Sequence, residues 1–183
     1  LKTDVSVDEG TGKSTVSVGL GWAFAKKGKK VLLVDMDEGL RCLDLMLGVD
    51  ESTVFDLSDV LMGKEIEDAV YACGFCEGLY LIPAPQKLGT IDDFSFSNFA
   101  NEVSEIYDVV IFDFPAGIHT ALYTCLPKDT TFLTVAVPDP VSIRDAAAIG
   151  NQLISRELKT RLIINRFILK EAKKYKFKNI DSI

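Results

Sequence analysis

The stretch Gly10-Thr11-Gly12-Lys13-Ser14-Thr15 decides the fold of this chain. It follows residues 1–6, in which we predict a short strand, and it opens a segment from Lys13 to Lys27 with helical spacing of its apolar residues. Glycines let the main chain turn its N–H groups toward an anion, and the positive end of a helix dipole adds to the attraction. In such a loop the lysine reaches the β- and γ-phosphates, and the hydroxyl after it binds Mg²⁺. We therefore predict that this stretch binds a nucleotide, with Lys13 at the terminal phosphates and Ser14 at the metal.

The composition indicates a protein that builds its own hydrophobic core. The chain has 183 residues, of which 48 % are apolar and 26 % are charged, and its net charge is −7. The negative net charge argues against a generally basic surface that binds nucleic acid. No apolar run reaches the ~18 residues that are needed to span a bilayer. We recognise no secretory signal, and the four cysteines then indicate a reduced, cytoplasmic protein. We expect one domain over residues 1–183.

Apolar runs alternate with amphipathic segments along the whole chain. The predicted strands after the first are Val31–Val34, Leu79–Ile82, Val109–Phe112, Phe132–Val137 and Leu162–Ile164. Their nearly complete apolar character indicates cover on both faces. The predicted helices are Lys13–Lys27, Asn98–Ile106, Ser142–Ile154 with Ser142 as its N-cap, and a helical pair over Phe55–Leu61 and Ile66–Tyr71. This alternation predicts an α/β fold with a mainly parallel sheet and helices on both faces.

Two of the predicted strands lead directly into aspartates. Val31–Val34 runs into Asp35-Met36-Asp37, and Val109–Phe112 runs into Asp113. Because parallel strands end at one edge of their sheet, we expect these carboxylates beside the phosphate loop. Asp113 is the candidate to hold the Mg²⁺ shell through water, and Asp37 is the candidate to lie near the metal and to orient or deprotonate an attacking water. The alternative is that strand-end aspartates only cap turns.

Longer segments resemble the MinD/ParA family of deviant Walker A P-loop ATPases, and its MinD-type members above all. Residues 35–44 (DMDEGLRCLD) are similar to the family segment D-x-D-x-G-L-R-N-L-D, and residues 109–118 (VVIFDFPAGI) to its I-I-D-S-P-A-G-I. Residues 141–146 (VSIRDA) resemble a helix start of the family, and residues 164–166 (INR) resemble the strand end that presents an adenine-contacting Asn-Arg pair. The resemblance covers nearly the whole chain.

The resemblance implies a SIMIBI-type P-loop fold that binds ATP or ADP with Mg²⁺ and hydrolyses ATP. In the family this fold continues beyond the point that corresponds to residue 183, into another strand, a loop and a membrane helix. Lys13 and Asp37 would be the catalytic residues, and Ser14, Asp37 and Asp113 would surround the metal. The nucleotide-binding residues that it implies are Gly10, Thr11, Gly12, Lys13, Ser14, Thr15, Pro115, Gly117, Asn165 and Arg166.

The same resemblance implies a switch that works by assembly. MinD-like members form nucleotide-dependent homodimers, meet a regulatory protein partner and attach peripherally to the inner face of the cell membrane through a C-terminal helix. ParA-like members bind DNA instead, which the segment at residues 35–44 makes the less favoured alternative. The expected function is septum placement in cell division, and plasmid partitioning or control of flagellar number are the alternatives.

The start of the phosphate loop departs from the family pattern. Val7 stands where the full motif has a glycine, Asp8 where the family has a second lysine that reaches the partner's phosphates, and Glu9 where glycine is usual. A carboxylate ~4 Å from a phosphate charge costs about 4 kcal/mol at an effective dielectric of about 20. A negative carboxylate would repel the negative charge that develops on the phosphate in the transition state, rather than stabilise it. We therefore expect weak or absent hydrolysis, and a non-hydrolysing regulator with the same fold is the alternative from another functional class.

A C-x-x-C pair, Cys73 and Cys76, precedes the predicted strand at Leu79–Ile82. One interpretation is a metal or redox role of the kind that iron–sulfur carriers have. The interpretation that we favour is a coincidence in a surface loop.

Overall fold

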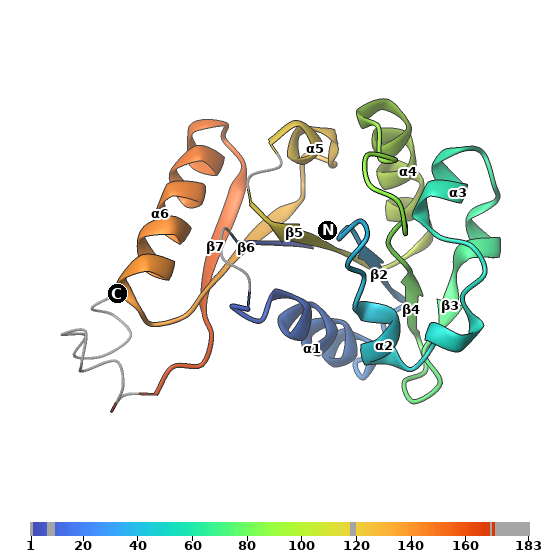
Figure 1. The fold of residues 1–183 in the computed structure, drawn as a ribbon, viewed down its shortest axis with the longest axis horizontal. Coiled ribbons are helices and arrows are strands. Elements are labelled where there is room, and N and C mark those ends of the chain that lie inside the picture. Colours follow the sequence, from blue (N-terminus) through green and yellow to red (C-terminus); the bar gives the residue numbers. More distant parts are fainter. Residues whose placement is uncertain (1, 7–9, 118–119, 169, 171–183) are drawn as a thin grey trace.

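The computed structural model describes residues 2–6, 10–117, 120–168 and 170, and it is built around one seven-stranded sheet (Figure 1). The strands are β1 Lys2–Ser6, β2 Val31–Asp35, β3 Tyr71–Ala72, β4 Leu79–Ile82, β5 Val109–Ala116, β6 Thr131–Ala136 and β7 Lys159–Ile164. Their order across the sheet is β3-β4-β2-β5-β1-β6-β7. Every neighbouring pair is parallel except β3 and β4, which pair antiparallel. The predicted α/β fold with a mainly parallel sheet is confirmed.

Helices connect the strands and cover the sheet. The α-helices are α1 Lys13–Ala25, α2 Leu43–Leu47, α3 Leu57–Leu61, α4 Asp93–Ile106, α5 Thr120–Cys125 and α6 Pro140–Ser155, and the 3-10 helices are Asp50–Ser52 and Ile66–Ala69. Figure 1 shows α1 and α2 on one side of the sheet and α4 and α5 on the other. Within the described ranges, none of these helices has the length and apolar character that crossing a bilayer requires.

Several helix boundaries differ from the predicted ones. Asp139, not Ser142, caps α6, because its carboxylate accepts hydrogen bonds from the N–H groups of Val141 and Ser142. The helix α4 starts five residues before the predicted Asn98, since the Asp92 carboxylate caps it by accepting from the N–H of Ser95. The second half of the predicted helical pair is only the short 3-10 helix, and Tyr71 already belongs to β3.

Two apolar cores lie on the two faces of the sheet. Leu32 of β2 points into the core that α4, α5 and α6 cover, and its neighbour Leu33 points into the core that α1 and α2 cover. Phe96 of α4 packs edge-on against Phe112 of β5, with ring centroids 5.4 Å apart. Each such fully buried side chain contributes roughly 1.5–3 kcal/mol. Because both faces of β2 are buried, its first four residues, Val31–Val34, are all apolar, and only its last residue, Asp35, is polar.

Small residues bring α1 close to the sheet. Its buried side consists of Lys13, Ser17, Gly21 and Ala25, which are spaced four apart. A Cβ atom at Gly21 would lie 3.0 Å from side-chain carbons of both Leu33 and Leu79. Glycine at this position therefore permits the approach that places Lys13 and Ser17 beside the ends of the central strands.

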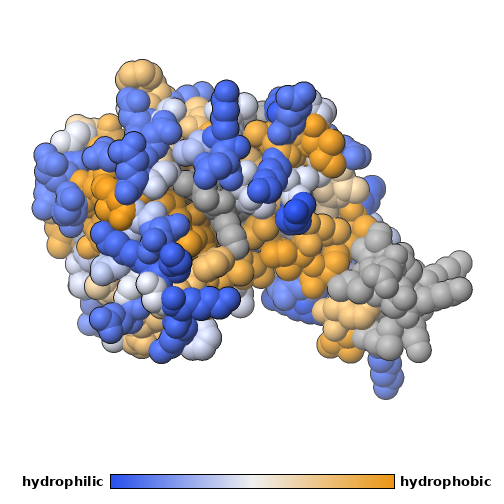
Figure 2. Space-filling view, turned by 180° about the vertical axis from the view of Figure 1, so that it is seen from behind, coloured by the Kyte–Doolittle hydropathy of each residue, from blue (hydrophilic) through white to orange (hydrophobic). Residues whose placement is uncertain are grey.

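The edge strand β7 is less covered than its sequence predicts. Its residues are half-buried or exposed, and Leu162 is 53 % exposed. Figure 2 shows apolar side chains gathered on the side of the molecule that carries β7. The expectation of cover on both faces is therefore wrong for Leu162–Ile164 in the described part of the chain, because α6 packs against one face of this strand.

Candidate functional site

The phosphate loop is described from Gly10 onward and passes directly into α1. Gly10 has φ +74° and Gly12, the N-cap of α1, has φ +92°, a conformation that favours glycine. The Gly12 carbonyl accepts the first helical hydrogen bond, from the N–H of Val16, at 2.9 Å. Thr11 is buried, and only 9 % of Lys13 is exposed. From Gly10 onward the structure thus confirms the predicted glycine turn and the helix start at Lys13, and phosphate binding stays a prediction.

Asp113 lies beside this loop, as predicted. It belongs to β5 and is a register partner of Asp35 on β2, so both carboxylates stand at the same edge of the sheet. The Ser17 hydroxyl donates to Asp113 Oδ1 at 3.0 Å. Burial raises the pKa of Asp113 above its ordinary value, although hydrogen bonds from Ser14 and Ser17 and the charge of Lys13 act in the opposite direction. Ser14, Lys13 and Asp113 are therefore within one small polar cluster.

Asp35 is the most buried carboxylate of the site; the sequence placed it at this edge of the sheet but assigned it no role. It is 0 % exposed, and it accepts hydrogen bonds from the N–H groups of Asp37 at 3.0 Å and of Cys42 and Leu43 at 3.1 Å. Burial, together with the charge of Asp113, raises its pKa to about 7 against those hydrogen bonds. Its place as the last residue of β2 is the signal that could have identified it. Asp35 holds the following loop to the sheet.

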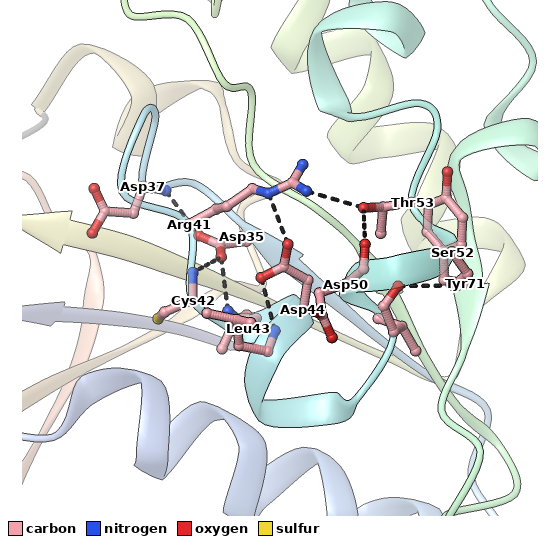
Figure 3. A network of polar contacts seen from close by, with 12 residues as sticks. Asp35, Asp37, Arg41, Cys42, Leu43, Asp44, Asp50, Ser52, Thr53 and Tyr71 are labelled. Carbon is pink, nitrogen blue, oxygen red and sulfur yellow. Dashed lines mark hydrogen bonds and ion pairs between the residues drawn. The ribbon is translucent and has the colours of Figure 1, made fainter.

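Asp37 takes its position from that loop. It is half-buried, and in Figure 3 its carboxylate turns away from Asp35 and from the hydrogen bonds that Asp35 accepts. Burial is the main cause of the raised pKa of Asp113, and the negative charge of the nearby Asp37 adds to it. The structure therefore brings Asp37 to the predicted edge of the sheet, and its role toward water or metal stays a prediction.

Cys42 is a second residue of the site that sequence reasoning missed. Burial raises the pKa of the Cys42 thiol, as do the charges of Asp35, Asp113 and Asp37, while the nearby Ser14 hydroxyl acts in the opposite direction. In the sequence, the only indication that Cys42 belongs to the site is its position in the segment that follows β2. The Cys42 side chain is therefore near Ser14 of the phosphate loop.

A network of charged and hydroxyl groups fixes α2 beneath the site (Figure 3). Arg41 Nε lies 2.7 Å from Asp44 Oδ2, and Asp44 is buried. Arg41 Nη2 also donates to Thr53 Oγ1 at 3.0 Å, and Thr53 donates in turn to the Asp50 carbonyl at 2.9 Å. The loop between β2 and α3 is thus tied internally as well as to Asp35.

Asn165, at the end of β7, reaches the phosphate loop. Its side-chain nitrogen donates to the Thr11 carbonyl at 2.8 Å, and its side-chain oxygen accepts from the N–H of Arg166 at 2.9 Å. Arg166 has φ +53° and is exposed. The structure brings Asn165 to the predicted site, where one of its N–H groups is bonded to the loop, and contact with adenine stays a prediction.

Pro115 and Gly117 lie at the end of β5, where the sequence predicts them. Pro115 lines a largely apolar cavity of about 350 Å³ together with Asp37, Leu40 and Leu88. Gly117 has φ +116°, and its carbonyl accepts a long hydrogen bond of 3.5 Å from the Tyr123 hydroxyl. Pro115 thus lines the same cavity as Asp37, and a contact of Pro115 or Gly117 with a nucleotide stays a prediction.

The donor set suits a phosphate anion with a hard cation. The cluster offers an ammonium at Lys13, a hydroxyl at Ser14 and a buried carboxylate at Asp113, whose charged form a nearby cation would favour. Within the described residues no group of three or more His, Cys, Asp or Glu is arranged to hold a metal ion. A Mg²⁺ ion bound by one hydroxyl, water and phosphates does not need such a group.

Cys73 and Cys76 lie in the turn between β3 and β4, so the loop part of the favoured interpretation is confirmed, but the two side chains are not at the surface. Both residues are buried in the apolar core on the α1 side, together with Leu79 and Leu81. The N–H of Cys73 donates to the Leu79 carbonyl at 2.9 Å, which fixes the turn between β3 and β4. The pair contributes packing to the core.

Val7, Asp8 and Glu9 carry the departure from the family pattern and lie outside the described residues. The expectation that they weaken hydrolysis stays a prediction.

The sequence and the fold both match known proteins. A family model described as an AAA domain matches residues 6–164. The septum site-determining protein MinD of Thermotoga maritima is 34 % identical over 181 residues, which cover 95 % of this chain and 66 % of that protein. The chain therefore spans just under two thirds of the length of this curated relative.

Two solved structures superpose on nearly the whole chain. The MinC:MinD cell division protein complex of Aquifex aeolicus has a TM-score of 0.84 and 30 % identity, with 99 % of this chain and 74 % of that chain covered. The septum site-determining protein MinD of Pyrococcus horikoshii, complexed with Mg-ADP, has a TM-score of 0.79 and 28 % identity, with 95 % and 76 % covered.

Proposed function

Because the chain belongs to the MinD/ParA family of P-loop ATPases, we propose that it is a MinD-like ATPase switch that takes part in placing the division septum. The observation that carries this proposal is the cluster of Lys13, Ser14 and Asp113 at the carboxyl edge of the sheet, next to the loop that begins at Gly10. The binding of Mg-ADP by the related Pyrococcus protein supports the choice of ligand.

In this proposal the loop residues bind the nucleotide and the strand ends organise the reaction. The N–H groups of residues 10–15 and the Lys13 ammonium bind the phosphates, and Ser14 supplies a hydroxyl ligand to the metal. Bound Mg²⁺ would neutralise charge that develops on the phosphate oxygens. Asp113 would hold the water shell of the metal by accepting hydrogen bonds, and Asp37 would orient the attacking water and accept its proton.

The nucleotide then controls assembly. We propose an ATP-dependent homodimer that meets a regulatory protein, as the Aquifex MinD protein meets MinC in its complex. Asn165 and Arg166 face the adenine, and Pro115 and Gly117 also contact the nucleotide. Peripheral attachment to the inner face of the cell membrane is part of the proposal, and DNA is the less favoured target.

Nucleotide titration tests the binding step. Titration calorimetry with Mg-ATP and Mg-ADP is expected to show saturable binding, and Lys13→Ala is expected to weaken it at least ~10-fold, because a charge-assisted contact to phosphate is lost. Lys27→Ala is the matched control, since Lys27 is an exposed lysine that follows the same helix. Absence of heat with both nucleotides would remove the basis of the proposal.

Light scattering tests the assembly step. A doubling of mass with Mg-ATP, and not with Mg-ADP, is the expected result. A single mass in both conditions would leave nucleotide binding intact and remove the proposed homodimer.

The second candidate is a regulator that binds nucleotide without hydrolysing it. Asp8 and Glu9, which replace the lysine and glycine of the family loop, favour it. The variant Asp8→Lys is expected to raise phosphate release, because an ammonium replaces a carboxylate near the developing phosphate charge. Unchanged phosphate release in this variant would contradict the effect that we assign to Asp8.

A further inference from the structure

Glu38 connects two loops that are fifty residues apart in the sequence. Its Oε2 accepts from the N–H of Gly89 at 3.0 Å, and its Oε1 accepts from the N–H of Thr90 at 2.8 Å and from the Thr90 hydroxyl at 2.7 Å. Partial burial acts to raise the pKa of Glu38, but these hydrogen bonds outweigh it and bring the pKa below its ordinary value. The carboxylate therefore fastens the loop after β2 to the loop after β4 in its charged form.

A main-chain hydrogen bond reinforces this connection, and at Gly39 the two loops leave little room for a side chain. The N–H of Gly39 donates to the Pro85 carbonyl at 2.9 Å. Gly39 has φ +80°, and a Cβ atom there would lie 3.4 Å from the Leu88 side chain. The two loops are thus packed against each other at the rim of the cavity that Asp37 and Pro115 line.

Asp37 lies between this connection and the sheet. On one side, the N–H of Met36 donates to the Asp113 carbonyl and the N–H of Asp37 donates to Asp35 Oδ1, both at 3.0 Å. On the other side, the next residue is Glu38. The main chain of Asp37 is therefore held at both ends, by the strand edge and by the loop after β4.

We propose that Glu38 is a positioning residue, which sets the place of the Asp37 carboxylate by fastening its segment to Gly89 and Thr90. This inference rests on the proposed ATPase function. The family segment D-x-D-x-G-L-R-N-L-D has a variable position where Glu38 stands, so the resemblance gave no reason to select it. Glu38 does not touch the reacting groups itself; it affects the reaction by setting the position of Asp37.

The test compares Glu38→Gln with Asp108→Asn in the full chain. Glu38→Gln removes the charge and one acceptor oxygen while it keeps the side-chain shape. Asp108 is the matched control, because its Oδ2 accepts from the N–H of Lys30 at 2.8 Å and so also joins two distant segments, but next to the starts of β2 and β5. Hydrogen exchange of single amides, Mg-ATP affinity, kcat and KM are measured on both variants.

The expected result is a local loosening that reaches Asp37. In Glu38→Gln, exchange rises about 10-fold at Gly89 and Thr90 and also at Asp37 and Leu40, whose N–H groups make hydrogen bonds in the same segment. The value of kcat falls about 10-fold while KM changes less than about 2-fold, because misplacement affects the reacting geometry more than binding. In Asp108→Asn, exchange rises at Lys30 and the kinetic constants stay unchanged.

Two outcomes would overturn the inference, and neither is the failure of the proposed function. The first is faster exchange at Gly89 and Thr90 with unchanged exchange at Asp37 and Leu40. The second is an unchanged kcat in a chain whose wild type hydrolyses ATP. If the wild type binds Mg-ATP without hydrolysing it, the exchange result alone decides, whereas a wild type that binds no nucleotide contradicts the proposed function itself.

Discussion

The side-chain amide of Asn165 donates a 2.8 Å hydrogen bond to the main-chain carbonyl of Thr11, 154 positions away. Asn165 is also bonded to β6, because its own N–H donates to the Ala136 carbonyl at 2.7 Å. The phosphate loop is thereby supported by the C-terminal edge of the sheet. The family resemblance implies that Asn165 contacts adenine, and the structure shows that Asn165 also supports the phosphate loop.

Removal of this support should weaken both the fold and nucleotide binding. Asn165→Ala is expected to lower the free energy of unfolding by about 1–2 kcal/mol, because the Thr11 carbonyl and the Arg166 N–H lose their partner. Mg-ATP affinity is expected to fall about 5-fold, since the loop is less well ordered before binding. Urea unfolding and calorimetry measure the two effects. Asn101→Ala is the control, because the Asn101 amide makes an equally long bond to Ser97 on the exposed side of α4.

A methyl group at Gly12 should be worse than one at Gly10. Both glycines have positive φ, which costs an alanine on the order of 1–2 kcal/mol. At Gly12 the new Cβ would also lie 2.4 Å from Asn165 Nδ2, whereas at Gly10 nothing lies within 4 Å. Urea unfolding without nucleotide is therefore expected to show a larger loss for Gly12→Ala than for Gly10→Ala. Equal losses would mean that the contact with Asn165 has no energetic effect.

The stability of the nucleotide-free chain should fall as the pH rises through neutrality. The pKa of Asp35 is about 7 in the fold against 3.8 for an ordinary aspartate, so the fold favours its protonated form. This contribution is complete below about pH 4 and is lost as the pH passes 7, with an upper limit of roughly 4 kcal/mol at about 1.4 kcal/mol per pKa unit. The raised pKa of Asp113 acts in the same direction. Urea unfolding between pH 5 and pH 8 should show the decline.

The variant Asp35→Asn separates the contribution of Asp35 from that of Asp113. It cannot titrate at this position, so the decline between pH 5 and pH 8 is expected to become shallower, whatever its absolute stability. An identical slope in both proteins would show that Asp35 is not the titrating group.

Breaking the ion pair under α2 should cost more than breaking one on the surface. Arg41→Met leaves the buried Asp44 carboxylate without its 2.7 Å partner and is expected to destabilise the chain by about 2–3 kcal/mol. Arg144→Met removes a 2.9 Å pair with Asp145 in which the arginine side chain is 74 % exposed, and less than about 1 kcal/mol is expected. Thermal unfolding of both variants provides the comparison, and a reversed order would contradict the role of burial.

Short-range sequence patterns were sufficient to predict the loop, the strands and the strand ends that make up the site. The stretch at residues 10–15 predicted its own loop and the start of α1, since glycine conformation and helix start are decided over a few neighbouring residues. The apolar runs predicted β2 and β5, and the aspartates after them predicted carboxylates at one edge of the sheet. Capping was harder, because Asp139 and Ser142 both suit the start of α6 and only the main-chain path selects between them.

The amino-acid sequence by itself determined the phosphate loop, the parallel α/β fold and the family, because these follow from short-range periodicity and contiguous motifs. Only the tertiary structure decided that Asp35 is buried beside Asp113, that Asn165 meets Thr11 and that Glu38 reaches Thr90. The physical reason is that such contacts close long loops of the chain, and short-range sequence patterns carry no information on which distant segments meet. Contacts between residues 52 to 154 positions apart depend on strand order and register, which no local pattern specifies.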